Sequence, residues 1–178
     1  MRESVGATKK FPKWKFFVCA FGSDISCNKK LSGMCNHVGQ HILLALHQKI
    51  DHKAQIAVEA DPCGLCGLEG CYIQLSESKI TSDCDYHYSR MNHKSAKKTS
   101  QSSPCANVPI HCPLCHQSTS GNLRTIWKYN TVYHIISEHT GNNEALSELP
   151  VQFTIDTFIR RQEEEWMGIT ADKTHEYR

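Results

Sequence analysis

The chain has 178 residues and a modest apolar content of 39%, so it can form one ordinary domain or two small ones, but not a single large core. Its ten cysteines and eleven histidines exceed what packing requires, which leaves disulfides, metal binding or redox chemistry. The longest apolar run, Ile42 to Leu46, is too short for a membrane span. We therefore expect an intracellular protein that does not enter membranes, with the nucleus as one candidate location. Its clustered cysteines are expected to bind metal.

Charge is distributed unevenly along the chain, although the net charge is only +2. Residues 86–137 contain six basic residues and no acid, whereas residues 138–178 contain nine acids and four bases. This asymmetry indicates a middle segment that faces a polyanion and an acidic tail. The alternative is that both segments are ordinary solvated surfaces.

Residues 1–60 are expected to form an N-terminal segment with one helix at about 37–50. Apolar residues recur there at helical spacing, and Asn36 is available as the N-cap. His37 and His41 lie four residues apart on one helix face, so a third zinc site is conceivable. Because the cysteines lack knuckle spacing, packed thiols and surface imidazoles are the preferred interpretation for this set, which comprises Cys19, Cys27, Cys35, His37 and His41.

Residues 61–141 are expected to form a zinc-binding module with two sites. The first begins with the knuckle Cys63-Gly-Leu-Cys66, and a strand through CYIQL then turns near residues 76–78 and returns toward Cys84. This arrangement is similar to a zinc ribbon and supplies three cysteine ligands. Strand alternation places Cys71 on the face of Ile73 and Leu75, so it is interpreted as a core thiol.

The fourth ligand of the first site is left open by the sequence. Cys105 is preferred because Pro104 fixes the chain beside it and because a thiolate matches the other three ligands. His87, which follows Cys84 closely, is the main alternative, and His93 is a further candidate.

The second site has a complete set of four ligands. Cys112 and Cys115 form a knuckle, and His134 and His139 follow on a helix predicted over 126–139, with Gly141 as its C-cap. Two cysteines and two histidines at this spacing are typical of a zinc finger with a lengthened loop. Two zinc ions per chain are therefore expected.

Residues 142–178 are expected to form an acidic tail with an amphipathic helix at about 152–167. The predicted apolar stripe consists of Ile155, Phe158, Ile159 and Trp166. Its arginines and its three consecutive glutamates are expected to face outward. The chain as a whole is predicted to be an α+β protein, with a small irregular zinc-stabilised fold, a ribbon-like hairpin, a Cys/Cys/His/His finger and flanking helices.

Several stretches carry a resemblance to known proteins. CGLCGLEGCYIQL, TSDC, SSPCANVPIHCPLC and IWKYNTVYHIISEH together resemble uncharacterised cysteine-rich zinc-finger-like proteins of mushroom-forming fungi. This resemblance covers Cys63 to His139 and implies zinc binding without a defined activity. The second half is more loosely similar to the BED-type fingers of transposases and chromatin factors, but it lacks their aromatic lead-in before the first cysteine.

The ligand sets argue against an enzyme, because both sites can close with four protein ligands and leave no open metal position. The segment PCGLC matches half of a zinc deaminase signature, but no His-x-Glu precedes it. The leading hypothesis is binding of DNA or RNA through the acid-free middle, with Trp127 and Tyr129 available for base stacking. Its predicted phosphate contacts are Arg90, Lys94, Lys97, Lys98 and Lys128. The alternative is a zinc-braced protein–protein interaction module that uses the C-terminal amphipathic helix.

Overall fold

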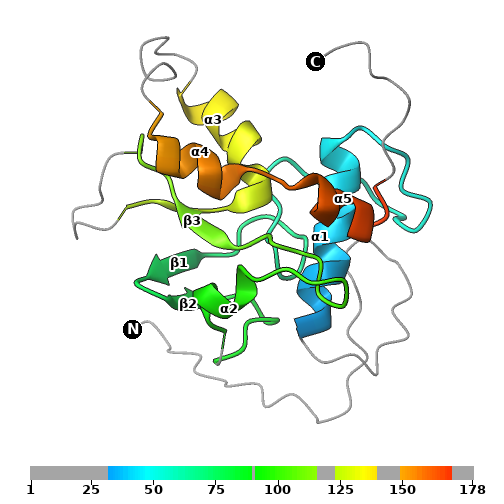
Figure 1. The fold of residues 1–178 in the computed structure, drawn as a ribbon, viewed down its shortest axis with the longest axis horizontal. Coiled ribbons are helices and arrows are strands. Elements are labelled where there is room, and N and C mark those ends of the chain that lie inside the picture. The colour runs from blue at the N-terminus through cyan, green and yellow to red at the C-terminus, as the bar shows by residue number, and fades with distance from the viewer. Residues whose placement is uncertain (1–31, 90, 116–122, 140–148, 170–178) are drawn as a thin grey trace, which may run out of the picture.

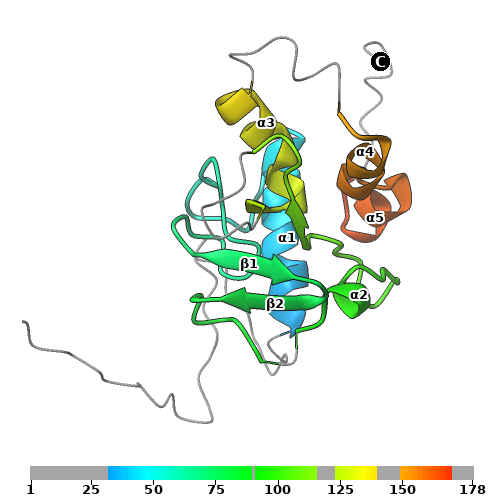
Figure 2. The same cartoon turned by 90° about the vertical axis from the view of Figure 1, so that its left-hand side faces the viewer.

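The computed structural model describes residues 32–89, 91–115, 123–139 and 149–169. It has an α+β fold with two small antiparallel hairpins and surrounding helices, which confirms the predicted fold class. In both views the β1–β2 hairpin lies toward one end of the molecule and helices α3 and α4 lie toward the other (Figures 1 and 2). No helix within the described ranges is long and apolar enough to cross a bilayer.

Helix α1, Ser32–Leu46, begins and ends earlier than the sequence predicted. Met34, Val38 and Ile42 recur every four residues and are buried, so one face of the helix enters the core. The helix ends in a Schellman motif, in which Lys49 N–H donates to Leu44 O at 2.8 Å while Gln48 adopts a positive φ of 53°. The chain therefore leaves the helix before the predicted boundary at residue 50.

The first hairpin joins β1, Ile73–Ser76, to β2, Lys79–Ser82, as the alternating pattern predicted. Ser76 pairs with Lys79, and Glu77 in the two-residue turn has a φ of 53°. A positive φ at the turn matches the twist of the flanking strands. Leu75 and Ile80 pair across the hairpin and are both buried.

The second hairpin joins β3, Pro109–His111, to β4, Thr125–Trp127. The helix predicted over 126–139 is therefore shorter: a 3-10 turn, η1, covers Lys128–Asn130, and α3 covers Thr131–His139. The physical reason is that Ile126 pairs with Ile110 and both are buried, so packing across the hairpin overrides the helical periodicity.

The single helix predicted at 152–167 is two helices, α4, Val151–Thr157, and α5, Arg161–Trp166. Phe158 is extended, with φ −62° and ψ 124°, and it breaks the helical path. The break turns Glu163 into the protein, where its side chain is only 1% exposed. The expectation that all three glutamates face outward is thus wrong for Glu163.

The buried apolar side chains in the described part of the chain form three clusters. One surrounds α1 and includes Tyr129 and Met167, the second surrounds Cys63 and Trp127, and the third lies between the β3–β4 hairpin and Phe153. The short helix α2, His93–Ala96, lies in the basic middle of the chain.

Candidate metal centres

The first candidate metal centre is a four-cysteine cluster formed by Cys63, Cys66, Cys71 and Cys84. Their sulfurs all lie within 4.8 Å of one another, and the Sγ atoms of Cys66 and Cys71 are 3.6 Å apart. Four sulfurs at the usual zinc distance are about 3.8 Å apart in a tetrahedron. The cluster therefore has the size and donor set of a closed structural zinc site.

The Cys63–Cys66 knuckle depends on close packing against Trp127. A Cβ placed on Gly64 would lie 2.5 Å from Cε3 of the Trp127 ring, so only glycine fits. Gly67 N–H donates to Cys63 O at 2.8 Å with a φ of 85°, which closes the turn. Leu65 N–H donates to Cys63 Sγ at 3.5 Å, a contact that would also stabilise a thiolate bound to a metal.

Cys71, not Cys105, completes the cluster, which corrects the sequence-based assignment. Strand alternation does not apply to Cys71, because β1 begins only at Ile73 and Gly70 turns the chain with a φ of 84°. Cys105 instead packs against α1, where a Cβ on Gly39 would lie 2.4 Å from its sulfur. Burial raises the pKa of the Cys105 thiol to about 12, so this residue is an inert core thiol.

The two histidine alternatives also lie outside the cluster. His87 Nε2 is 2.9 Å from Ile80 O, to which its ring N–H donates. Burial lowers the pKa of His93, and its side chain belongs to α2 rather than to the knuckle.

The second candidate metal centre, the Cys2His2 cluster, consists of the residues expected from the sequence: Cys112, Cys115, His134 and His139. Cys115 Sγ is 3.3 Å from His134 Nε2 and 3.5 Å from His139 Nε2. Sulfur and nitrogen ligands of one tetrahedral zinc are about 3.5 Å apart. Both histidines lie on α3, and the Cys112 amide donates to Arg124 O at 2.9 Å, which ties the knuckle to the second hairpin.

Burial and contacts between neighbouring side chains shift the pKa values of residues in both clusters. Hydrogen bonds from the thiols of Cys63 and then Cys84 lower the pKa of Cys66, so one sulfur in the first cluster accepts from its neighbours. Burial, followed by nearby Arg124, lowers the pKa of His134 and keeps its imidazole neutral at pH 7. Burial raises the pKa of Cys115 to about 12, and a bound cation would reverse this effect.

The two clusters are mechanically connected. Asn130 in η1 donates from Nδ2 to Asp61 Oδ1 at 2.6 Å and to Pro62 O at 2.9 Å, immediately before the first knuckle. Trp127, which packs on that knuckle, ends strand β4 of the hairpin that precedes α3. These contacts join the chain that leads into the first knuckle to the segment that leads into α3.

The basic residues predicted to contact phosphate are only partly available. Lys128 is 6% exposed and forms a buried ion pair with Glu163, so its assignment as a phosphate contact is wrong. Trp127 and Tyr129 are buried core residues rather than stacking platforms. Lys94, Lys97 and Lys98 are exposed, whereas Arg90 lies outside the described residues.

The described residues include only part of the N-terminal set of cysteines and histidines. Cys19 and Cys27 lie outside the described residues, and Cys35 packs beside the four-cysteine cluster as a thiol whose pKa burial raises to about 11. His37 and His41 approach each other on α1, with their Nε2 atoms 3.0 Å apart. Every cysteine within the described ranges is a free thiol.

Comparison with known proteins identifies no relative: no family model, curated protein or solved structure matches the chain. The resemblance to fungal and BED-type zinc fingers thus stays a prediction. Among its described residues, the chain provides two compact Cys/His groups, each able to hold one metal ion.

Proposed function

We propose that this chain is a zinc-braced protein-binding module whose docking surface lies where α4 meets α5. The observation that carries this proposal is the exposure of Ile155 and Phe158, at 61% and 66%, beside a pocket of about 190 Å³. A pocket of this size is smaller than the ~300–1,000 Å³ typical of small-molecule sites. It suits one inserted side chain of a partner better than a metabolite.

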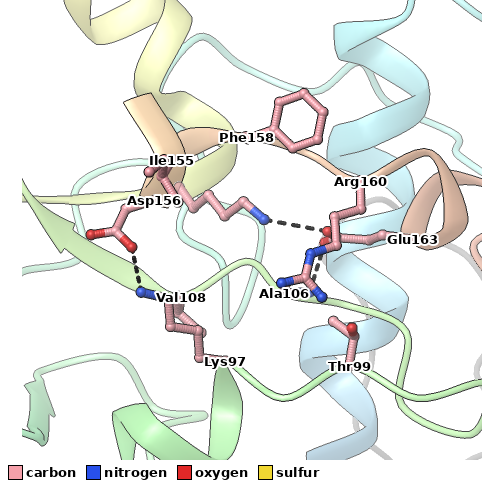
Figure 3. Close-up of a pocket in the computed structure, with 10 residues that line it drawn as sticks. Lys97, Thr99, Ala106, Val108, Ile155, Asp156, Phe158, Arg160 and Glu163 are labelled. Carbon is pink, nitrogen blue, oxygen red and sulfur yellow. Dashed lines mark hydrogen bonds and ion pairs between the residues drawn. The ribbon is translucent and has the colours of Figure 1, made fainter. Parts of the chain in front are cut away.

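The pocket has an apolar edge and a charged interior (Figure 3). Ile155 and Phe158 line the α4–α5 side, and Val108 and Ala106 lie across from them. Large apolar side chains exposed beside a hollow are typical of interaction surfaces. The edge therefore favours a partner that contributes an apolar side chain.

The charges of the pocket favour an acidic group on the partner. Lys97 pairs with Asp156 at 2.5 Å, and Lys128 pairs with Glu163 at 3.3 Å, so these four charges compensate one another. Arg160 also lines the pocket, and no acid pairs with it among the described residues. A carboxylate on the partner would complement its guanidinium. The proposed ligand is therefore a peptide segment in which an apolar residue stands near Asp or Glu.

A binding role is favoured over catalysis because each metal cluster has four protein ligands. Such closed sites brace a fold and leave no position for substrate or water. Zinc is the proposed ion, since a four-sulfur set and a two-sulfur, two-imidazole set both match its tetrahedral preference.

Nucleic-acid binding is the second candidate, and the exposed lysines of α2 and the turn after it support it. Lys94 and Lys98 project from a stretch without acids, and Lys97 beside them is exposed but pairs with Asp156. Backbone phosphates would be their ligands. This candidate ranks second because Lys128, Trp127 and Tyr129 are buried and unavailable.

A displayed library of random dodecapeptides, selected on the zinc-loaded full chain, tests the leading proposal. The enriched peptides should combine an apolar residue with an acid. Phe158→Ala should weaken a selected peptide by roughly tenfold or more, as at interface hot spots, and Arg160→Ala should weaken acidic peptides selectively. Val151→Ala is the matched control, because Val151 is an exposed apolar residue at the start of α4 and does not line the pocket.

Failure to enrich any motif, or equal binding by the Phe158→Ala variant, would reject the docking surface. Fluorescence anisotropy with a mixed-sequence oligonucleotide then decides the second candidate. Binding through phosphates should weaken steeply with salt, and replacing Lys94, Lys97 and Lys98 with Ala should reduce the salt dependence.

A further inference from the structure

Helix α1 brings two imidazoles together outside both cysteine-containing clusters. His37 and His41 lie one helical turn apart, and their Nε2 atoms are 3.0 Å apart. Their rings are nearly perpendicular, at 88°, with centroids separated by 4.5 Å. The two histidines of the Cys2His2 cluster have a similar arrangement, with an interplanar angle of 77° and a centroid separation of 5.1 Å. The α1 pair thus has the geometry of the pair that belongs to a candidate metal centre in the same molecule.

Asp51 fixes the orientation of His41. Its Oδ2 accepts a hydrogen bond from His41 Nδ1, while its Oδ1 accepts from the backbone amides of Lys53 at 2.9 Å and Ala54 at 3.3 Å. A proton on Nδ1 leaves the Nε2 lone pair of neutral His41 directed at His37. Metal-binding histidines are oriented in this way, by a carboxylate on the ring nitrogen that does not bind the metal.

The spacing of the two nitrogens is close to that required by one metal ion. Two imidazole nitrogens on a tetrahedral zinc are about 3.3 Å apart, so a small opening of the pair from 3.0 Å would admit the ion. His41 is 2% exposed and held by Asp51, whereas His37 is half-buried. The movement required is smaller than an ordinary side-chain adjustment.

We propose that His37 and His41 form a third metal site, for zinc or another divalent ion that favours imidazole, with Asp51 as its positioning residue. This site differs from the other two in having only two ligands among the described residues. Water or an external donor would fill the remaining coordination positions of the ion. This ion should therefore exchange more readily than those of the two cysteine-containing clusters. The alternative is a histidine–histidine hydrogen bond with no metal function, which has the same distances in the metal-free protein.

Metal titration of the full chain with zinc, and with cobalt as a spectroscopic probe, separates these possibilities. The unaltered protein should bind two equivalents tightly and a third more weakly. His37→Ala should abolish the third equivalent and retain the other two, whereas the matched control His52→Ala, at an exposed histidine near Asp51, should retain all three. Asp51→Asn should weaken the third equivalent by roughly 10- to 100-fold.

Integrity of the variants is checked by their melting temperature and by the two tight equivalents. A wild-type protein that binds only two equivalents would overturn the third site, as would a third equivalent that persists in His37→Ala. Should His37→Ala fail to fold, Asp51→Asn decides the matter: an unchanged third dissociation constant in that variant rejects the proposal.

Discussion

Lys128 and Glu163 form an ion pair in the interior of the protein, with Nζ and the carboxylate oxygen 3.3 Å apart and side-chain exposures of 7% and 1%. The carboxylate also accepts hydrogen bonds from the Ala106 amide at 2.8 Å and from the Tyr129 hydroxyl. These contacts attach α5 to the middle of the chain. Glu163 is therefore a structural residue of the core, although it lies in an acidic run.

Removing one partner of this pair should destabilise the protein strongly. Glu163→Gln leaves a buried ammonium group without its counter-charge, a defect that typically costs about 3–5 kcal/mol. Urea denaturation of the zinc-loaded protein measures the loss. Arg161→Ala is the matched control, because it breaks the exposed Arg161–Glu165 pair, which should matter little. A loss no larger than that of the control would contradict the buried pair.

Cysteine substitutions should separate ligand from core thiol. Cys71→Ala removes one ligand of the four-cysteine cluster and should reduce the tightly bound metal by one equivalent. Cys105→Ala should retain all metal and should lower stability only modestly, because it truncates a packed side chain. Elemental analysis together with denaturation measures both effects. The opposite pattern, with metal lost from the Cys105 variant, would restore the assignment made from the sequence.

Chelation should alter the environment of Trp127. Because its ring packs on the glycine of the first knuckle, removal of the metal should loosen that turn and expose the indole. The expected result is a red shift of tryptophan emission that zinc reverses. Gly64→Ala should produce much of this shift even with zinc present, since its new Cβ would meet the ring at 2.5 Å. An emission spectrum unaffected by chelation would be inconsistent with metal-dependent packing here.

The thiol of Cys105 should contribute to the alkaline loss of stability. Burial raises the pKa of Cys105 from 9.0 to about 12, so above pH 9 the unfolded chain releases this proton while the folded chain retains it. The free energy of unfolding should therefore fall as pH rises from 9 toward 12. Denaturation at pH 8 and pH 10 should show a smaller fall in Cys105→Ala than in the unaltered protein. Equal falls in the two proteins would argue against a buried, protonated thiol.

Local sequence patterns predicted the parts of the fold that depend on neighbouring residues. The knuckle spacing of Cys63 with Cys66 and of Cys112 with Cys115 is visible in the sequence, and so is the hairpin between Ile73 and Ser82. These features require only a few residues to adopt a turn or an alternating strand. The structure shows them close to where the sequence placed them.

The remaining features depend on contacts between distant residues. Cys71 leaves the strand pattern because of the turn at Gly70, and Ile126 joins a strand because Ile110 lies opposite. Glu163 is buried only because the break at Phe158 redirects the chain toward a lysine 35 positions earlier. Periodicity within a single segment contains no information about such partners.

The hydrogen bonds from Asn130 to Asp61 and Pro62 have a consequence for how the protein fills with metal. Because the turn before α3 is tied to the chain leading into the first knuckle, ordering one centre lowers the entropic cost of ordering the other. Loading should therefore be cooperative. When zinc is scarce, the population should divide between complete molecules and empty ones, with few half-loaded, so that the abundance of the folded form responds steeply to the zinc supply.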